Sequence, residues 1–140
     1  MPIVSRVVEI EGLRLLDGGI ADSIPLRYFQ QQGFGRNVVV LTQPADYRKG
    51  PLKHLGIIRR MLKAYPVLVE AWERRHEMYN AELSYIDEQQ KAGNAIILCP
   101  PTTLPIGRVS HSRSAMRKAY QLGRTMATDK LDDLRTFLAR

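Results

Sequence analysis

Residues 38–41, with the sequence Val-Val-Val-Leu, constrain the fold more than any other segment. A continuous apolar run without polar alternation is typical of a strand that is covered on both faces. Residues 96–99, Ile-Ile-Leu-Cys, form a second run of this kind and are halted by two prolines. Such strands belong to parallel sheets with helices on each side. We therefore expect an α/β fold in which residues 37–42 and 94–99 are strands.

The remaining sequence alternates between strand and helix patterns. It predicts short strands over residues 6–10 and 13–16, joined by a turn at Glu11-Gly12, and a short helix over residues 25–32. Apolar residues at helical spacing predict a helix from Pro51 that stops before Pro66, and a longer one that follows and ends at Gly93. Two more helices are expected after caps at Ser112 and Thr128. This order indicates one α/β domain or part of one.

Residues 16–19, Leu-Asp-Gly-Gly, carry the clearest chemical motif. A carboxylate that accepts a proton from a Ser hydroxyl must approach it within hydrogen-bond distance, and Gly18 and Gly19 let the backbone turn sharply and come close to a substrate. Without a His, Asp17 needs a partly desolvated site that raises its pKa. An ordinary hairpin turn is the alternative interpretation of the three residues.

The longer segment of residues 12–26 resembles a known family. Residues 12–19 are similar to the strand and turn that deliver the catalytic Asp of patatin-like acyl hydrolases, and residues 21–26 are similar to the segment that follows. A looser likeness to the bacterial patatin-like phospholipases includes Met1-Pro2, residues 105–108 and the closing helices. The resemblance implies a mostly parallel three-layer sheet with flanking helices, lipid or small-ester substrates, and a Ser/Asp dyad in which Asp17 is the Asp and Gly18 and Gly19 support it.

The Ser of that dyad is missing from the sequence. No Ser lies in a Gly-x-Ser-x-Gly pattern, and the family's Gly-rich oxyanion loop is also missing. In the family both precede the Asp motif, so we expect residues 1–140 to be the C-terminal portion of one patatin-like domain and to be inactive alone. A fragment that begins at a late strand exposes unpaired backbone groups, so we expect self-association or pairing with the N-terminal half, with residues 38–41 covered by the partner.

Charge gives a second signal, because 21 Lys and Arg outnumber 14 Asp and Glu and the net charge is +7. The sequence between Asp46 and Glu70 contains no acid, and four of its basic residues are expected on a helix face opposite the apolar stripe: Lys49, Lys53, Arg60 and Lys63. Such a face suits anionic lipid head groups, at about 1 kcal/mol per residue. The alternatives are a solvated face without a partner and a non-catalytic basic α/β module that binds anionic lipid or another polyanion.

Other functional classes are excluded by missing residues. His76 begins a zinc-protease pattern, but Asn80 stands where the second His is needed, so we expect no metal and a solvent-facing His76. Residues 33–35 lack the third Gly of a dinucleotide site, and we expect no cofactor. No RNA-binding or helix-turn-helix pattern is present, so we expect no nucleic-acid partner. Cys99 is expected in the core. The sequence shows no signal peptide or spanning segment, and we expect a cytoplasmic protein with peripheral membrane contact.

Overall fold

The computed structural model describes residues 7–53, 55–107 and 110–139. The expectations for Met1-Pro2, Arg6 and Arg108 fall outside these residues. The chain forms two compact units, of which unit 1 contains the described residues of Met1–Pro25 and Arg48–Ser84 and unit 2 those of Leu26–Tyr47 and Tyr85–Arg140. Among the described residues, no helix combines the length and the apolar character needed to cross a bilayer.

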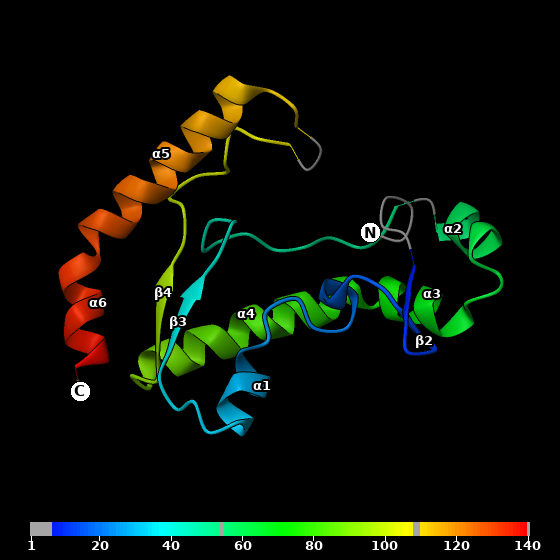
Figure 1. Cartoon of the computed structure of the whole chain (residues 1–140), viewed down its shortest axis with the longest axis horizontal. Helices are drawn as coiled ribbons and strands as arrows, with labels where there is room; N and C mark the ends of the chain where they lie inside the picture. Colours follow the sequence, from blue (N-terminus) through cyan, green and yellow to red (C-terminus); the bar gives the residue numbers. More distant parts are fainter. Residues whose placement is uncertain (1–6, 54, 108–109, 140) are drawn as a thin grey trace. The chain divides into compact units, whose positions relative to one another are not determined.

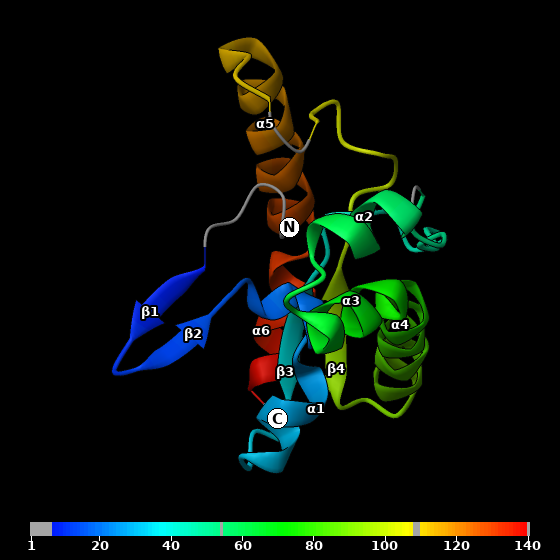
Figure 2. The ribbon, with the colours of Figure 1, turned by 90° about the vertical axis from the view of Figure 1, so that its right-hand side faces the viewer.

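Unit 1 begins with the expected pair of short strands, β1 (Val8–Ile10) and β2 (Leu13–Leu15). They form an antiparallel hairpin in which Val8 lies opposite Leu15 (Figure 2). Glu11 and Gly12 connect them with positive φ angles of 52° and 78°, as a two-residue turn that matches the strand twist requires. The expected turn is confirmed. Every residue of both strands is exposed.

The helices of unit 1 follow the expected order with different bounds: η1 (Gly18–Ile20), α2 (Leu55–Met61), α3 (Pro66–Glu73) and α4 (Arg75–Lys91), whose last residues belong to unit 2. The prediction of a single long helix after residue 65 is wrong. The chain forms two helices there, α3 and α4, which are separated at Arg74. The Arg74 N–H bonds to the Trp72 carbonyl as well as to that of Glu70, which tightens the last turn of α3. The core of this unit contains Ile20, Ile58, Val69, Trp72 and Leu83.

Unit 2 contains a parallel strand pair, β3 (Asn37–Val40) and β4 (Ala95–Leu98), which lie side by side in Figure 1. Asn37 pairs with Ala95 and Val40 with Leu98. The expected mixed α/β class and the parallel pairing are confirmed. The helices of the unit are α1 (Leu26–Gln31), α5 (Arg113–Asp129), α6 (Leu131–Leu138) and the end of α4.

The two strands of unit 2 are covered to different extents within the described chain. In β3, Val39 is buried, whereas Val38 is 38% and Val40 64% exposed. Successive side chains of a strand point to opposite faces, so β3 is open on the face of Val38 and Val40, whereas β4 is covered on both faces because Ala95 and Leu98, three residues apart, are both buried. Among the described residues, the expected cover on both faces is therefore found for β4 and is absent for β3. That a partner chain covers residues 38–41 stays a prediction.

The expected helix caps give mixed results. The Ser112 hydroxyl accepts the Ala115 N–H at 3.4 Å and caps α5, as expected. Thr128 does not cap α6, because α5 continues to Asp129 and places Thr128 inside the helix. Its hydroxyl donates to the Arg124 carbonyl at 2.9 Å instead, one turn back.

We expect Ile86→Ala to destabilise the protein by about 2–5 kcal/mol, since the cavity that it leaves adds to the lost transfer free energy. Ile86 is only 1% exposed. The matched variant Val40→Ala, at an exposed position, is expected to change stability by about 0.5 kcal/mol. Urea unfolding followed by circular dichroism measures both. Equal losses in the two variants would contradict this assignment of the core.

Candidate functional site

Asp17 lies directly after β2 and caps η1. Its Oδ1 accepts the N–H of Gly19 at 3.0 Å, as a short carboxylate at a helix start does. Asp17 is exposed, whereas Ile20, three residues later, is buried and anchors the turn. The backbone bond therefore gives an exposed carboxylate a defined orientation.

The two glycines act differently from expectation. Gly12, Gly33 and Gly93 are the described glycines with positive φ, so the turn at Gly18 and Gly19 uses a backbone conformation open to other residues. A Cβ on Gly19 would lie 3.3 Å from the Asp17 Oδ1 and 3.4 Å from the Arg75 Nη2, so a side chain there would require the Asp17 carboxylate to shift by a few tenths of an ångström. A Cβ on Gly18 would meet no described atom within 4 Å.

Two charged residues of α4 bind the loop of residues 17–24, which we call the Asp17 loop. Arg75 Nε donates to the Gly19 carbonyl at 2.6 Å, and the Ser23 hydroxyl donates to the same oxygen at 2.7 Å. Glu82 accepts two successive N–H groups, from Ser23 on Oε1 and from Ile24 on Oε2, each at 3.1 Å. Arg75 and Glu82 are seven residues apart, and therefore lie on one face of α4, two turns from each other. The sequence analysis missed both residues.

The two carboxylates of this site have pKa values shifted in opposite directions. The Gly19 N–H and the Arg75 charge hold the pKa of Asp17 below its ordinary value. Burial raises the pKa of Glu82, and the charge of Asp22 adds to this effect while the Ser23 and Ile24 N–H groups oppose it. Asp17 is exposed in the described chain, so the desolvated site that its role as a base requires is not formed there.

The four basic residues expected on one helix face do not share a helix. Arg60 lies in α2 and is exposed, whereas Lys53 and Lys63 are exposed residues outside it. The Lys49 ammonium packs over the Tyr79 ring at 4.7 Å from its centroid. The expected face is wrong because α2 begins at Leu55, four residues after Pro51.

The helix that carried the partial zinc pattern has a structural role. Asn80 binds the Lys49 backbone in both directions, accepting its N–H at 2.9 Å and donating to its carbonyl at 3.0 Å. His76 is half-buried, with Nδ1 2.9 Å from the Glu73 carbonyl oxygen, so a solvent-facing His76 is wrong. Within the described part of the chain, no group of three or more His, Cys, Asp or Glu residues is placed to hold a metal ion.

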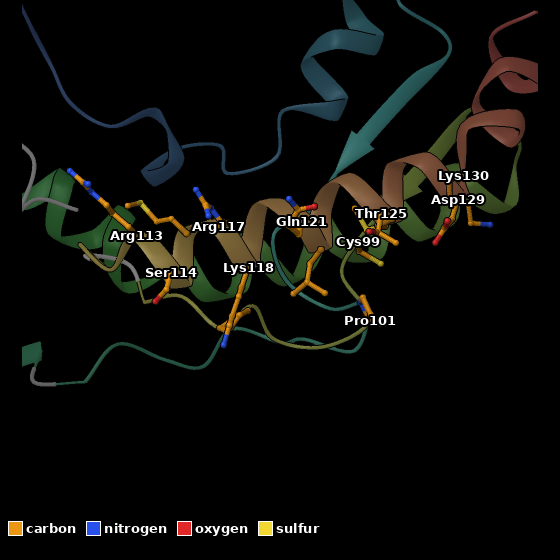
Figure 3. Close-up of a pocket in the computed structure, with 14 residues that line it drawn as sticks. Cys99, Pro101, Arg113, Ser114, Arg117, Lys118, Gln121, Thr125, Asp129 and Lys130 are labelled. Carbon is orange, nitrogen blue, oxygen red and sulfur yellow. The ribbon is translucent and has the colours of Figure 1, made fainter.

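Unit 2 contains a separate open cavity of about 1340 Å³ along α5. Cys99, Pro101 and Pro105 line one side of it, and α5 residues such as Leu122 and Met126 line another. Figure 3 shows Arg113 and Arg117 on one side of α5 and Lys118 on the other. Cys99 is half-buried at this cavity, so its expected place in the core is wrong.

Comparison with known proteins gives a family and one distant relative. A family model described as "Domain of unknown function (DUF6363)" matches residues 65–139, which include Arg75 and Glu82 but not the Asp17 loop. "Uncharacterized protein YjjU" of Escherichia coli (strain K12) is 28% identical over 119 residues. The match covers 84% of this chain and 33% of that protein, so the chain spans about a third of the relative's length. No solved structure matches the chain significantly.

The raised pKa of Glu82 predicts a pH effect on folding. A carboxyl group with a raised pKa stabilises the fold fully below its unfolded pKa, and this contribution is lost as the pH rises through the folded value. Compared with Glu82→Gln, the unsubstituted protein should therefore lose stability as the pH rises above 4.5. Urea unfolding followed by the fluorescence of Trp72, below pH 4.5 and at neutral pH, measures the difference. A difference that stays constant with pH would contradict the shift.

Proposed function

Given that the chain belongs to the DUF6363 family, a domain of unknown function, we propose from its own residues that it is the Asp-bearing part of a patatin-like serine acyl hydrolase. Asp17 is the Asp of the Ser/Asp dyad, and the Ser is supplied by a nucleophile-bearing half that precedes the Asp motif. The observation that carries this proposal is the exposed Asp17 carboxylate, oriented by the Gly19 N–H at 3.0 Å within a motif that resembles the family's. The substrates are lipid or small esters. The complete domain has three layers, with a mostly parallel sheet flanked by helices.

The proposed reaction is transfer of the acyl group to Ser and then to water. The Ser oxygen forms a bond to the ester carbonyl carbon while its proton passes to Asp17. Asp17 returns that proton to the leaving alkoxide as the carbon–oxygen bond of the ester breaks. Water then attacks the acyl-enzyme with Asp17 again accepting the proton, and Ser recovers its proton as the acid leaves.

The Gly19 N–H that Asp17 accepts favours the charged carboxylate, which a proton acceptor requires. A strongly solvated carboxylate is a weak base, so the assembled enzyme needs to cover Asp17. The nucleophile-bearing half, docking on the exposed side of the Asp17 loop, supplies that cover. The length of the relative supports this proposal, because this chain spans only about a third of it and the rest is long enough to contain such a half.

A second candidate function is that of a basic module that binds an anionic lipid surface. It is favoured by α5, where Arg113, Arg117, Lys118 and Arg124 are all exposed and acidic residues are missing before Asp129. Helices with basic and apolar faces of this kind bind at the surface of membranes. Sedimentation with vesicles separates this candidate from the first: binding to anionic vesicles without ester hydrolysis by any longer form of the protein supports the second.

The 140-residue chain alone is expected not to hydrolyse p-nitrophenyl esters above a denatured control. It lacks a Gly-x-Ser-x-Gly nucleophile, and the loss of a single oxyanion donor alone lowers rates about 10²–10³-fold. Absorbance at the nitrophenolate band measures turnover. Turnover that disappears in Asp17→Ala would require a nucleophile within this chain and would overturn the proposed division.

Asp17→Asn is expected to lower ester hydrolysis by about 10²–10⁴-fold in the chain extended by the polypeptide encoded upstream of Met1. Asn keeps the shape and accepts the Gly19 N–H but cannot take the proton. The matched variant Asp22→Asn changes a carboxylate of the same loop and should reduce the rate far less. Equal losses would show that the loop, rather than the Asp17 base, carries the effect, and an upstream polypeptide without Gly-x-Ser-x-Gly would overturn the proposal.

A further inference from the structure

The Asp17 loop has little apolar support of its own. Ile20 is the buried residue among residues 17–24, at 5% exposure, and Asp17, Gly18, Ala21 and Asp22 are exposed. An exposed loop with few apolar contacts samples several conformations unless polar contacts hold it. A catalytic carboxylate must keep its position to a fraction of an ångström. The geometry of Asp17 therefore depends on side chains from outside the loop.

Arg75 acts at the start of the loop through the backbone of Gly19. The Gly19 N–H bonds to the Asp17 carboxylate, and the carbonyl of the same residue accepts Arg75 Nε at 2.6 Å. Holding that carbonyl fixes the position of the residue whose N–H orients Asp17.

Glu82 acts at the end of the loop. Its two carboxylate oxygens accept the N–H groups of Ser23 and Ile24, each at 3.1 Å. Ser23 in turn donates its hydroxyl to the Gly19 carbonyl at 2.7 Å. The contact of Glu82 therefore reaches the same carbonyl oxygen that Arg75 binds, and the two α4 residues hold one connected set of hydrogen bonds.

We infer that Arg75 and Glu82 are positioning residues for Asp17, and that the DUF6363 region of the chain supports the Asp17 loop through them. The catalytic consequence rests on the proposed function, whereas the support of the loop does not. Neither residue touches the substrate in this account. Both act through the backbone of residues 19, 23 and 24.

Amide hydrogen exchange, measured by NMR on the 140-residue chain, tests the support of the loop. Arg75→Gln is expected to speed exchange at the Gly19 amide at least about tenfold, because its acceptor, the Asp17 carboxylate, loses position. Glu82→Ala is expected to do the same at Ser23 and Ile24, because it removes the carboxylate that both N–H groups bind. Exchange at Val69, a buried residue of unit 1 whose N–H donates to the Tyr65 carbonyl at 3.1 Å, shows whether each variant is folded. Arg75→Lys, which keeps one donor and the charge, should recover part of the protection at Gly19.

Arg74→Gln and Glu77→Gln are matched controls, since both residues are exposed on the same stretch of chain and neither binds the Asp17 loop. They should leave exchange at Gly19, Ser23 and Ile24 unchanged. Unchanged exchange in Arg75→Gln and Glu82→Ala, in folded protein, would overturn the inference.

Ester hydrolysis by the chain extended upstream of Met1 tests the consequence for Asp17. A misplacement of about 1 Å costs about 10²-fold in rate, so Arg75→Gln should lower kcat about 10–100-fold with little change in KM, and Arg75→Lys should recover part of it. Faster exchange with unchanged kcat would overturn the positioning role. If the unsubstituted extended protein hydrolyses no ester, the proposed function fails, and the exchange experiment alone decides whether Arg75 and Glu82 hold the loop.

Discussion

The site depends on the backbone of one residue, Gly19, which is bonded at both its N–H and its carbonyl. The Gly19 N–H orients the Asp17 carboxylate at 3.0 Å, and the Gly19 carbonyl accepts Arg75 at 2.6 Å. Because a charged donor makes a stronger hydrogen bond than a neutral one, the guanidinium fixes this carbonyl more firmly than solvent would. The loop and α4 are 56 residues apart in sequence at this contact. The motif therefore obtains its geometry from a distant helix, which lies in the DUF6363 region.

Apolar faces and one carboxylate are left open in the described chain. The β3–β4 pair leaves Val40 64% exposed, and α5 and α6 have no buried residue although both are amphipathic. The Asp17 carboxylate is exposed as well. Under the proposal of a nucleophile-bearing half, that half covers the exposed carboxylate.

The sequence predicts the local elements well and the support of the site poorly. The runs at residues 38–41 and 96–99 identify a parallel pair, and Glu11-Gly12 identifies a hairpin, because these signals depend on nearby residues. The roles of Arg75 and Glu82, like the break at Arg74, depend on contacts with residues far along the chain. The spacing of apolar residues in the sequence does not report such contacts. The half-burial of Glu82 shows that it faces protein, but only the structure identifies the loop that it binds.

The central claim, that Asp17 activates a Ser, is tested most directly by the rate at which a fluorophosphonate labels the protein extended upstream of Met1. Such a reagent forms a covalent bond with an activated Ser, and mass spectrometry identifies the modified residue. The account predicts labelling at the Ser of a Gly-x-Ser-x-Gly segment, at a rate that falls at least about 10²-fold in Asp17→Asn while Asp22→Asn stays close to the unsubstituted protein. Labelling at the same rate in Asp17→Asn, or labelling at no Ser of such a segment, would contradict it.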